Sequence, residues 1–474
     1  MPNTWATSGV DLHLDLDPGG TRVRASLEAA LRDAMRTGRL RPGTRLPSSR
    51  ALAADLGIAR NTVADAYGQL VAEAWLDSRH GAGTWVAERS APPTPVAVQM
   101  RAEAGRVHYD LRPGVPDLSS FPRTPWLAAA RRALAAASRD AFGYGDLRGL
   151  LELREALASY LSRARGVVVS ADRIVVCSGF AHGLELMCDV LRAGGGRTIA
   201  AEAFGHTRLR RVVEARGLDA TTVPVDLGGA VAEEIGAADA VLLTPAHQFP
   251  IGVPLAPERR RRVVEWASRT GHLIIEDDYD GEFRYDRQSV GALQALAPEH
   301  VVYGGTASKS LAPGLRLGWL VVPAHLTDAV VAAKHDSGSL TSSSLDQLTL
   351  AEFITSGAYD RHVRRVRIAY RRRRDRLVAA LRQRVPRVRV TGISAGLHAL
   401  VDLDGQPEDE VIARAAQHGL VINGLNSFAV DGRAHRSALV VGYATPPEHA
   451  FTTALARLCA VLAATEGTSV RTGQ

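Results

Sequence analysis

The sequence of 474 residues predicts an α/β protein, in which a small helical domain at the N-terminus precedes a large domain built on a mostly parallel, buried sheet. Apolar, β-branched runs alternate with helical stretches through the large domain, and such runs are typical of strands covered on both faces. The two parts are separated by a segment that contains Pro92, Pro93 and Pro95. Because proline favours extended backbone, we expect this segment to be a semi-rigid linker.

Composition narrows the class of protein. With 46% hydrophobic residues the chain can bury a large core, and its three cysteines lack metal-ligand spacing. No apolar run approaches the roughly 18 residues of a membrane span. We therefore expect a cytoplasmic protein without disulfides, a bound metal or a membrane segment. The predicted segments are an N-terminal extension (1–20), a helix-turn-helix domain (21–87), the linker (88–107), the α/β domain (108–464) and a C-terminal tail (465–474).

The N-terminal domain is predicted to contain three helices and a small β-wing. Apolar residues at helical spacing predict the first helix over 23–35. A serine cap opens a short second helix over 49–56, Gly57 turns the chain, and the third helix covers 59–74. The alternating segment 75–86 is expected to form the wing. The residues of the third helix expected to face the core are Val63, Tyr67 and Leu70.

The run 42–50, Pro-Gly-Thr-Arg-Leu-Pro-Ser-Ser-Arg, resembles the winged helix-turn-helix of the GntR family, and the resemblance continues through the third helix and the wing. It implies binding to a double-stranded DNA operator, mostly through backbone phosphates, so that binding weakens steeply with salt. A helical accessory domain is the alternative. The residues expected to contact DNA are Arg45, Ser48, Arg50, Arg60, Asn61 and Thr62, with His80 and Gly81 in the wing.

Two charged features of the large domain are expected to face solvent. The arginine-rich run 361–376 has apolar residues at helical spacing, so we interpret it as the exposed face of a long helix rather than as a DNA contact. Lys334 lies in a helical stretch with no neighbour that would make it reactive, and we expect it to be solvated. The net charge of +7 adds little, because net charge alone governs solubility and non-specific binding.

Six apolar runs predict the strands of the large sheet: 174–176, 198–200, 241–243, 273–275, 301–303 and 320–322. Ligands of open parallel sheets bind at the carboxyl ends of the strands, so the residues that follow these runs are the candidates. Ser178–Leu184 opens a helix and offers free backbone N–H groups to a phosphate. The acidic run Glu276–Asp280 allows three interpretations: metal ligands, a solvated loop, or a carboxylate that holds a heterocyclic nitrogen protonated beside a phenol.

Lys309 carries the functional interpretation. Only two of the 57 lysine and arginine residues are lysines, so arginine fills nearly every basic position. A guanidinium keeps its proton, whereas a lysine amine with a lowered pKa can form a Schiff base with an aldehyde. Ser308 and Arg316 are placed to hold a phosphate. A Schiff-base lysine, a carboxylate for a pyridinium and a phosphate cradle are what pyridoxal 5′-phosphate (PLP) requires.

From about Thr21 to Ala464 the chain resembles the MocR/GabR group of bacterial regulators, in which a GntR-type winged helix is joined to a domain similar to fold-type I aminotransferases. The runs 244–252 and 275–280 and the Lys309 segment carry this resemblance. It implies a smaller α+β part at the C-terminal end and a homodimer. The implied PLP contacts are Lys309 as the Schiff base, Asp277 (or Asp278) at the pyridine nitrogen, Tyr279 with His247 or Gln248 at the ring hydroxyl, Ser308, Arg316, Gly179, Phe180 and Ala181 at the phosphate, and Tyr144 from the neighbouring subunit.

Two positions depart from the family pattern. His206 stands where the family places an aromatic ring over the cofactor, and an imidazole can still stack there. Val440 stands where the family supplies an arginine for the substrate α-carboxylate, and valine cannot form that ion pair. Arg208, Arg433 and Arg436 are candidate substitutes, and Arg208 is the one that we expect to bind an effector.

Three functions fit this pattern: a regulator that senses an amino compound through PLP, a regulator of vitamin B6 metabolism that responds to PLP itself, and a working aminotransferase with an accessory domain. Val440 and the linked DNA-binding domain count against the third. We therefore expect the aminotransferase-like domain to sense a ligand rather than to catalyse a reaction, with residual transamination as the alternative. Val440 also favours PLP itself as the effector over an amino compound.

Overall fold

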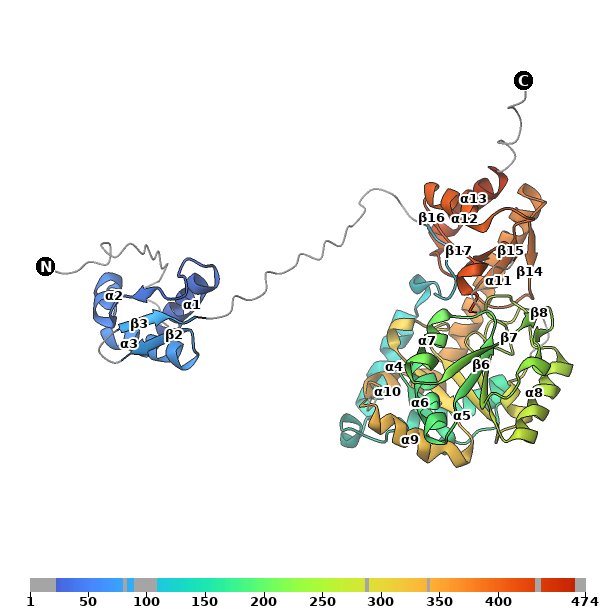
Figure 1. Ribbon diagram of the computed structural model, residues 1–474, viewed down its shortest axis with the longest axis horizontal. Helices are drawn as coiled ribbons and strands as arrows, with labels where there is room; N and C mark the ends of the chain where they lie inside the picture. The colour runs from blue at the N-terminus through green and yellow to red at the C-terminus, as the bar shows by residue number, and fades with distance from the viewer. Residues whose placement is uncertain are drawn as a thin grey trace, which may run out of the picture. The chain divides into compact units, whose positions relative to one another are not determined.

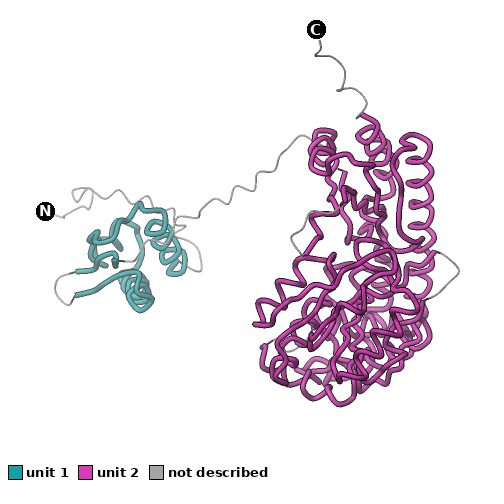
Figure 2. Tube along the Cα trace, turned by 45° about the vertical axis from the view of Figure 1, so that its right-hand side comes forward, with its two compact units in different colours: residues 1–103 teal, residues 104–474 magenta. Residues whose placement is uncertain are grey.

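The structure, a computed structural model, describes residues 23–79, 83–88, 109–285, 290–338, 342–430 and 436–464. The chain divides into two compact units, Met1–Glu103 and Ala104–Gln474 (Figure 2). The N-terminal extension, nearly all of the predicted linker, the tail after 464, and His80 and Gly81 of the predicted wing lie outside the described residues. No helix in the described ranges has the length and apolarity needed to cross a membrane.

The first unit is a winged helix-turn-helix, as predicted. Its helices are α1 (Val23–Arg36), α2 (Ser49–Leu56) and α3 (Arg60–Ala72), and its sheet has the order β1 (Arg45–Leu46), β3 (Gly83–Val86), β2 (Leu76–Arg79). The hydroxyl of Ser48 caps α2 by accepting a hydrogen bond from the backbone N–H of Ala51 at 3.2 Å. Gly57 ends α2 in the left-handed conformation that lets the chain turn into α3. Val63, Tyr67 and Leu70 are buried in the core, as the periodicity of α3 predicts.

The second unit is built on a mainly parallel, seven-stranded sheet (Figure 1). In spatial order the strands are β5 (Ile174–Cys177), β13 (Gly318–Val321), β12 (Val301–Thr306), β11 (Leu273–Asp277), β10 (Ala240–Leu243), β6 (Thr198–Glu202) and β7 (Asp219–Val223). All six predicted strands are present. Two features differ from the expectation: β13 runs antiparallel to both neighbours, and the edge strand β7 is polar and contains no apolar run.

Helices cover both faces of this sheet. Successive residues of a strand point to opposite faces, so Ile174 and Val176 pack with α5 (Leu151–Arg165) and α10 (Ser344–Thr355), whereas Val175 and Cys177 pack with α6 (Phe180–Ala193). The remaining helices of this part are α4 (Arg123–Ala136), α7 (Thr207–Ala215), α8 (Pro257–Thr270), α9 (Thr327–Asp336) and α11 (Ala358–Arg384). This two-sided burial explains why the strands are apolar along their whole length.

A smaller α+β part completes the second unit, at the end opposite α9 (Figure 1). Its sheet has the order β14 (Arg389–Thr391), β15 (Ala399–Asp402), β18 (Ala438–Val441), β17 (Asn423–Gly424), and its helices are α12 (Glu408–Gln417) and α13 (Glu448–Ala463). Two short pairs also occur: β16 (Leu420–Val421) with β4 (Tyr109–Asp110), and β8 (Val225–Asp226) with β9 (Gly229–Ala230). The fold class expected from the sequence is therefore confirmed.

The arginine-rich run lies on α11, and most of its guanidinium groups are exposed, as predicted. Arg373 is the exception. It is buried, and its guanidinium pairs with Asp117 at 2.7 Å and with Glu448 at 2.8 Å. One side chain of the run therefore joins the helix to two other segments of the unit.

The expectation for Lys334 is wrong. Its side chain on α9 is 1% exposed, and Nζ donates hydrogen bonds to the carbonyl oxygens of Leu147 and Val176, both at 2.6 Å. Leu147, which is far away in the sequence, covers the amine. The local helical pattern around Lys334 therefore gave no sign that this side chain is buried. Desolvation lowers the pKa of this lysine.

Candidate functional site

A cavity of about 280 Å³ opens at the carboxyl ends of the central strands β6, β10, β11 and β12, where ligands of such sheets bind. Ten of the residues expected from the sequence line it: Gly179, Phe180, Ala181, His206, Arg208, Asp277, Tyr279, Ser308, Lys309 and Arg316. Lining residues that the sequence did not single out include Glu202, Phe204, Thr244, Phe249 and Arg210. The folding of the sheet therefore brings together segments that are more than 130 positions apart in the sequence.

Lys309 lies on the loop after β12, and its Nζ donates a hydrogen bond to the carbonyl oxygen of Gly114. Desolvation lowers the pKa of Lys309, while the carboxylates of Asp277 and Asp280 act in the opposite direction. A lowered pKa increases the fraction of neutral, nucleophilic amine. Lys309 therefore lines the cavity and has the lowered pKa that favours Schiff-base formation.

Asp277 is the acidic residue of β11 that faces the cavity. Alternation along the strand turns its neighbours away: Glu276 accepts hydrogen bonds from the backbone of Leu293 and Gln294, and Asp278 pairs with Arg165 at 2.7 Å. Oδ1 of Asp277 is buried without a hydrogen-bond partner in the described part of the chain, and this burial raises the pKa of the carboxyl well above its usual range. A cationic N–H group in the cavity would satisfy this oxygen.

One end of the cavity suits an anion. Gly179, at a φ of 97°, begins α6, so the first backbone N–H groups of that helix and its positive dipole end face the cavity. The guanidinium of Arg316 reaches the same turn and donates a hydrogen bond to the carbonyl oxygen of Ser178. Ser308 also lines the cavity there. Helix terminus, guanidinium and hydroxyl together are the groups that bind phosphate.

Aromatic rings form one wall. The His206 ring stacks on Phe249 with a centroid distance of 4.3 Å and an interplanar angle of 17°. Desolvation, and then the Lys309 ammonium, lower the pKa of His206 to about 4, so its imidazole is neutral near pH 7. The peptide bond from Phe249 to Pro250 is cis. This wall can accept the face of a flat heterocycle.

Val440 offers no anchor for a carboxylate. It is 0% exposed in β18 and packs in an apolar cluster with Phe204 and Ile251. Of the candidate substitutes, Arg208 lines the cavity, Arg436 instead pairs with Asp402 at 3.4 Å, and Arg433 lies outside the described residues. The arginines of the described lining are therefore Arg208, Arg210 and Arg316, and of these Arg210 pairs with Glu214 at 2.9 Å.

Three expected contacts do not belong to the lining in this single chain. Gln248 is buried, and its amide nitrogen donates to the carbonyl oxygens of Phe204 at 2.9 Å and Phe249 at 2.7 Å. His247 is buried behind Tyr279. Tyr144 is 86% exposed and lies on a loop at the surface of the unit. A contact from Tyr144 to a cofactor would therefore require a second copy of the chain.

Glu202 is a lining residue that sequence reasoning missed. It ends β6, and its carboxyl accepts hydrogen bonds from the hydroxyl and the backbone N–H of Thr244. Burial raises the pKa of Glu202 to about 7, although those hydrogen bonds and one from Gln248 act against this increase. The sequence signal that could have identified this residue is an acidic side chain directly after a predicted strand.

The expected DNA contacts of the first unit lie at its surface. Arg45, Ser48, Arg50, Arg60 and Asn61 are exposed, and Thr62 is half-buried. In the wing, the guanidinium groups of Arg45 and Arg79 lie over the ring of Trp85, at 5.6 and 6.0 Å from its centroid. Arg79 and Trp85 were not singled out from the sequence. The described wing thus presents two positive charges held by one aromatic ring.

Comparisons with known proteins match both units. Residues 24–86 match the model of bacterial regulatory proteins of the gntR family, and residues 112–458 match that of aminotransferase class I and II. The pyridoxine biosynthesis regulator PdxR of Corynebacterium glutamicum is 32% identical over 94% of this chain and 98% of its own. The probable rhizopine catabolism regulator MocR of Rhizobium meliloti is 32% identical over 83% and 84%.

Among solved structures, an archaeal alanine:glyoxylate aminotransferase superposes with a TM-score of 0.69 at 24% identity, over 76% of this chain and 92% of the other. That likeness shows the fold of the second unit. The two relatives described above, which match 94% and 83% of this chain, are named as transcriptional regulators. The chain therefore belongs to the MocR-type transcriptional regulators, in which a GntR-family winged helix-turn-helix is joined to an aminotransferase-like domain.

Proposed function

We propose that this transcriptional regulator binds PLP in the cavity of its aminotransferase-like domain and changes its affinity for operator DNA in response. The observation that carries the proposal is that Lys309 and Asp277, whose buried Oδ1 has no partner in the described part of the chain, line the same cavity. An aldehyde suits the first group and a pyridinium N–H suits the second. The gntR-family match and the exposed polar residues of α2 and α3 support DNA as the partner of residues 21–87.

The other lining residues take complementary roles in this proposal. Arg316, Ser308 and the first turn of α6 hold the phosphate, His206 stacks on the ring, and Tyr279 bonds the ring hydroxyl. Bound PLP would supply an electrophilic aldehyde to which an amine can add. The chain's own contribution is to orient that group, to lower the pKa of Lys309 and to place the carboxyl of Asp277 beside the ring nitrogen.

A homodimer is part of the proposal. Exposed apolar side chains occur on α4, on the loop after it and at the starts of α5 and α10, and α10 packs against both α4 and α5; these side chains are Leu127, Leu134, Phe142, Tyr144, Leu151 and Leu345. A second copy of the chain would cover this face, and Tyr144 of each copy would then reach the phosphate site of the other. We also propose that the protein acts in the cytoplasm, where operator DNA and PLP meet.

PLP itself is the effector that we favour. Val440 fills the position of the usual carboxylate anchor with a buried apolar side chain. A relative that matches almost the whole chain is named a pyridoxine biosynthesis regulator. The second candidate effector is an amino acid, because Arg208 in the cavity lining offers a carboxylate partner. A working aminotransferase is the alternative function, with the DNA-binding unit as an accessory.

The test is the visible absorbance of the full-length protein, wild type and Lys309→Ala, during titration with PLP and then with a panel of amines and amino acids. The proposal expects a band in the wild type that is absent in Lys309→Ala, and operator binding that changes on addition of PLP alone. If operator binding does not change on addition of PLP but changes on addition of one amine, that amine is the effector. Steady conversion of PLP to its aminated form would support the enzyme.

A further inference from the structure

The first described residues after the linker lead directly to the ligand cavity. These residues, 109–115, are called the entry segment below. The entry segment begins with β4 and reaches Gly114, whose carbonyl oxygen accepts the hydrogen bond from Nζ of Lys309. A Cβ atom on Gly114 would lie 3.8 Å from this nitrogen and 3.7 Å from the ring of His206. One short stretch of backbone therefore connects the linker with the amine to which the proposed function assigns PLP.

The small α+β part holds the start of the entry segment by its backbone. The N–H groups of Tyr109 and Leu111 donate hydrogen bonds of 2.8 Å to carbonyl oxygens in and next to β16. The N–H group of Gly442 donates to the carbonyl oxygen of Leu111 at 2.7 Å. A Cβ atom on Gly442 would lie 2.2 Å from the carbonyl oxygen of Arg112, so the two backbones are in direct contact. The entry segment is therefore bonded to the small part near one end and to Lys309 near the other.

Thr445 holds the entry segment close to Gly114. The hydroxyl of Thr445 lies 2.6 Å from the carbonyl oxygen of Arg112 and 3.0 Å from that of Val115, and it can donate to either. Since these two carbonyl groups flank Gly114, one side chain of the small part fixes the backbone on both sides of the residue that meets Lys309. A displacement of Gly114 would therefore strain the contacts that Thr445 makes.

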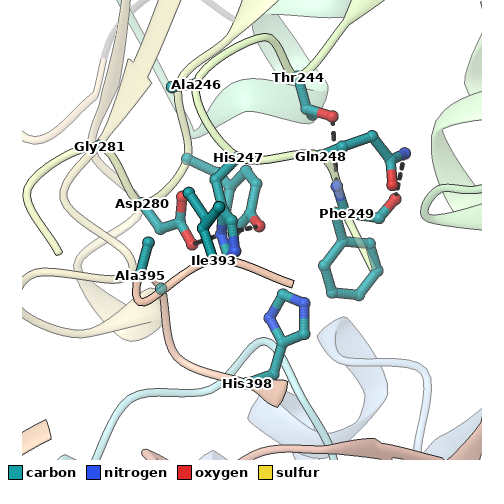
Figure 3. Close-up of polar contacts among 12 residues, drawn as sticks. Thr244, Ala246, His247, Gln248, Phe249, Asp280, Gly281, Ile393, Ala395 and His398 are labelled. Carbon is teal, nitrogen blue, oxygen red and sulfur yellow. Dashed lines mark hydrogen bonds and ion pairs between the residues drawn. The ribbon is translucent and has the colours of Figure 1, made fainter. Parts of the chain in front are cut away.

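The small part also packs against the large part at a place that does not involve Lys309. Residues 393–398 lie against His247 and Asp280 (Figure 3). The N–H group of Ile393 donates to the carbonyl oxygen of Gly252 at 2.7 Å. Loss of the hydrogen bond from the lysine amine leaves these contacts in place. We therefore expect the direct effect of such a loss to lie in the entry segment.

Condensation with an aldehyde changes what Lys309 can donate. The nitrogen of the neutral amine attacks the carbonyl carbon, a C=N double bond forms, and the aldehyde oxygen leaves as water with both amine hydrogens. A nitrogen that then takes up a proton has one donor in a planar group, in place of the three donors of an ammonium on a flexible stem. The carbonyl oxygen of Gly114 therefore has this donor as long as Lys309 is a free amine, and condensation removes it.

We propose that the hydrogen bond between Lys309 and Gly114 links the chemical state of the lysine to the entry segment and, through the linker, to the DNA-binding unit. This inference rests on the proposed PLP site and adds the contact by which that site acts on the linker. A ligand shifts DNA binding only through a difference in its affinity for two arrangements of the protein. The two arrangements here differ in whether Gly114 is bonded to Lys309, and attachment of PLP favours the one without this bond.

Hydrogen exchange of the entry segment in the full-length protein tests this link. PLP should speed the exchange of these amides in the wild type by about tenfold, the change expected when one hydrogen bond is lost. PLP-free Lys309→Met should show the same increase, because methionine fills similar space without a donor. Residues 393–398 are the internal control and should exchange equally in PLP-free wild type and Lys309→Met. If the entry segment of Lys309→Met exchanges like that of the PLP-free wild type, the inference is overturned.

Operator affinity with and without PLP is the second readout. Thr445→Val removes the hydroxyl that holds the entry segment, so it should reduce the PLP-dependent change in operator affinity by about threefold while the visible band still forms. Thr445→Ser keeps the hydroxyl and should respond like the wild type. A full response in Thr445→Val would contradict the inference and leave the PLP site intact. A wild type that forms no Lys309-dependent band, or whose operator binding ignores PLP, would overturn the proposed function and this inference with it.

Discussion

The two lysines of this chain occupy contrasting environments on the same large unit. Desolvation lowers the pKa of both. Lys309 faces a cavity, with Asp277 and Asp280 near enough to influence its charge. Lys334 faces two carbonyl oxygens, of Leu147 and Val176, and its side chain is sealed from solvent. Burial alone therefore does not make a lysine reactive, because the amine must also face space that a ligand can enter.

The same contrast gives a different reason for lysine rather than arginine at each of the two positions. Under the proposed function the reason at Lys309 is chemical, since a guanidinium cannot act as an amine nucleophile. At Lys334 the reason is geometric. A compact ammonium fits between two carbonyl oxygens at 2.6 Å, whereas a planar guanidinium is larger and distributes its donors over a fork.

The largest expected effect comes from Lys309→Arg, which should abolish the visible band of the PLP-loaded protein completely. The substitution keeps a positive charge beside Asp277, so thermal unfolding should remain close to that of the wild type. Absorbance spectra and a melting curve on the same sample check both expectations. A residual band of the same position would mean that another amine, such as Lys334, can reach the cofactor.

Lys334→Met should lower the free energy of unfolding by about 2–4 kcal/mol, because two buried carbonyl oxygens lose their donor. The matched control is Lys309→Met, in which the side chain faces the cavity and the cost should be small. Denaturant unfolding of the two variants without PLP measures the difference. Equal costs would contradict the distinction between an open and a sealed lysine.

Gly149→Ala tests the seal around Lys334. Gly149 follows Leu147 closely, adopts a φ of 100°, and would place a Cβ atom 2.5 Å from Cγ2 of Val176. We expect a loss of about 1–3 kcal/mol from the backbone conformation and the clash. Gly166→Ala is the control, since its φ of 69° is also positive but no atom lies within 4 Å of the added carbon. If both variants lose the same stability, packing against Val176 is unimportant.

Glu202→Gln tests the raised pKa of a residue in the cavity lining through the pH dependence of the protein's stability. Burial raises the pKa of Glu202 from 4.5 to about 7, so between these values the folded protein holds a proton that the unfolded chain has released. Stability should therefore fall as the pH rises through this window, and the substitution, which leaves no titrating group there, should remove about 3 kcal/mol of that fall. Unfolding free energies measured below and above this window give the comparison. Identical pH dependence in both proteins would contradict the raised pKa.

Much of the site was predictable because strand geometry is periodic. The run after residue 273 alternates, so Asp277 and Tyr279 share one side of the chain while Glu276 and Asp278 share the other. The apolar runs likewise located the strands, and the carboxyl-end rule located the cavity. Such features depend on neighbours in sequence or on a general property of parallel sheets.

The rest depends on contacts between distant segments. Lys334 is sealed by residues almost 190 positions earlier, which no local pattern around it records. The polar edge strand β7 is held by its pairing with β6 rather than by an apolar run of its own. The arrangement of His247 and Asp280 behind Tyr279 required the turn after β11 to fold back on the segment after β10.

The scarcity of lysine also gives the protein a simple analytical signature. A protease that cleaves only after lysine would divide the denatured chain into three peptides, which end at residues 309, 334 and 474. Reductive trapping of an aldehyde on Lys309 would block the first cut, whereas the sealed Lys334 would escape the reagent as long as the protein is folded. The site of attachment could then be identified from the number of bands on a gel, without sequencing a single peptide.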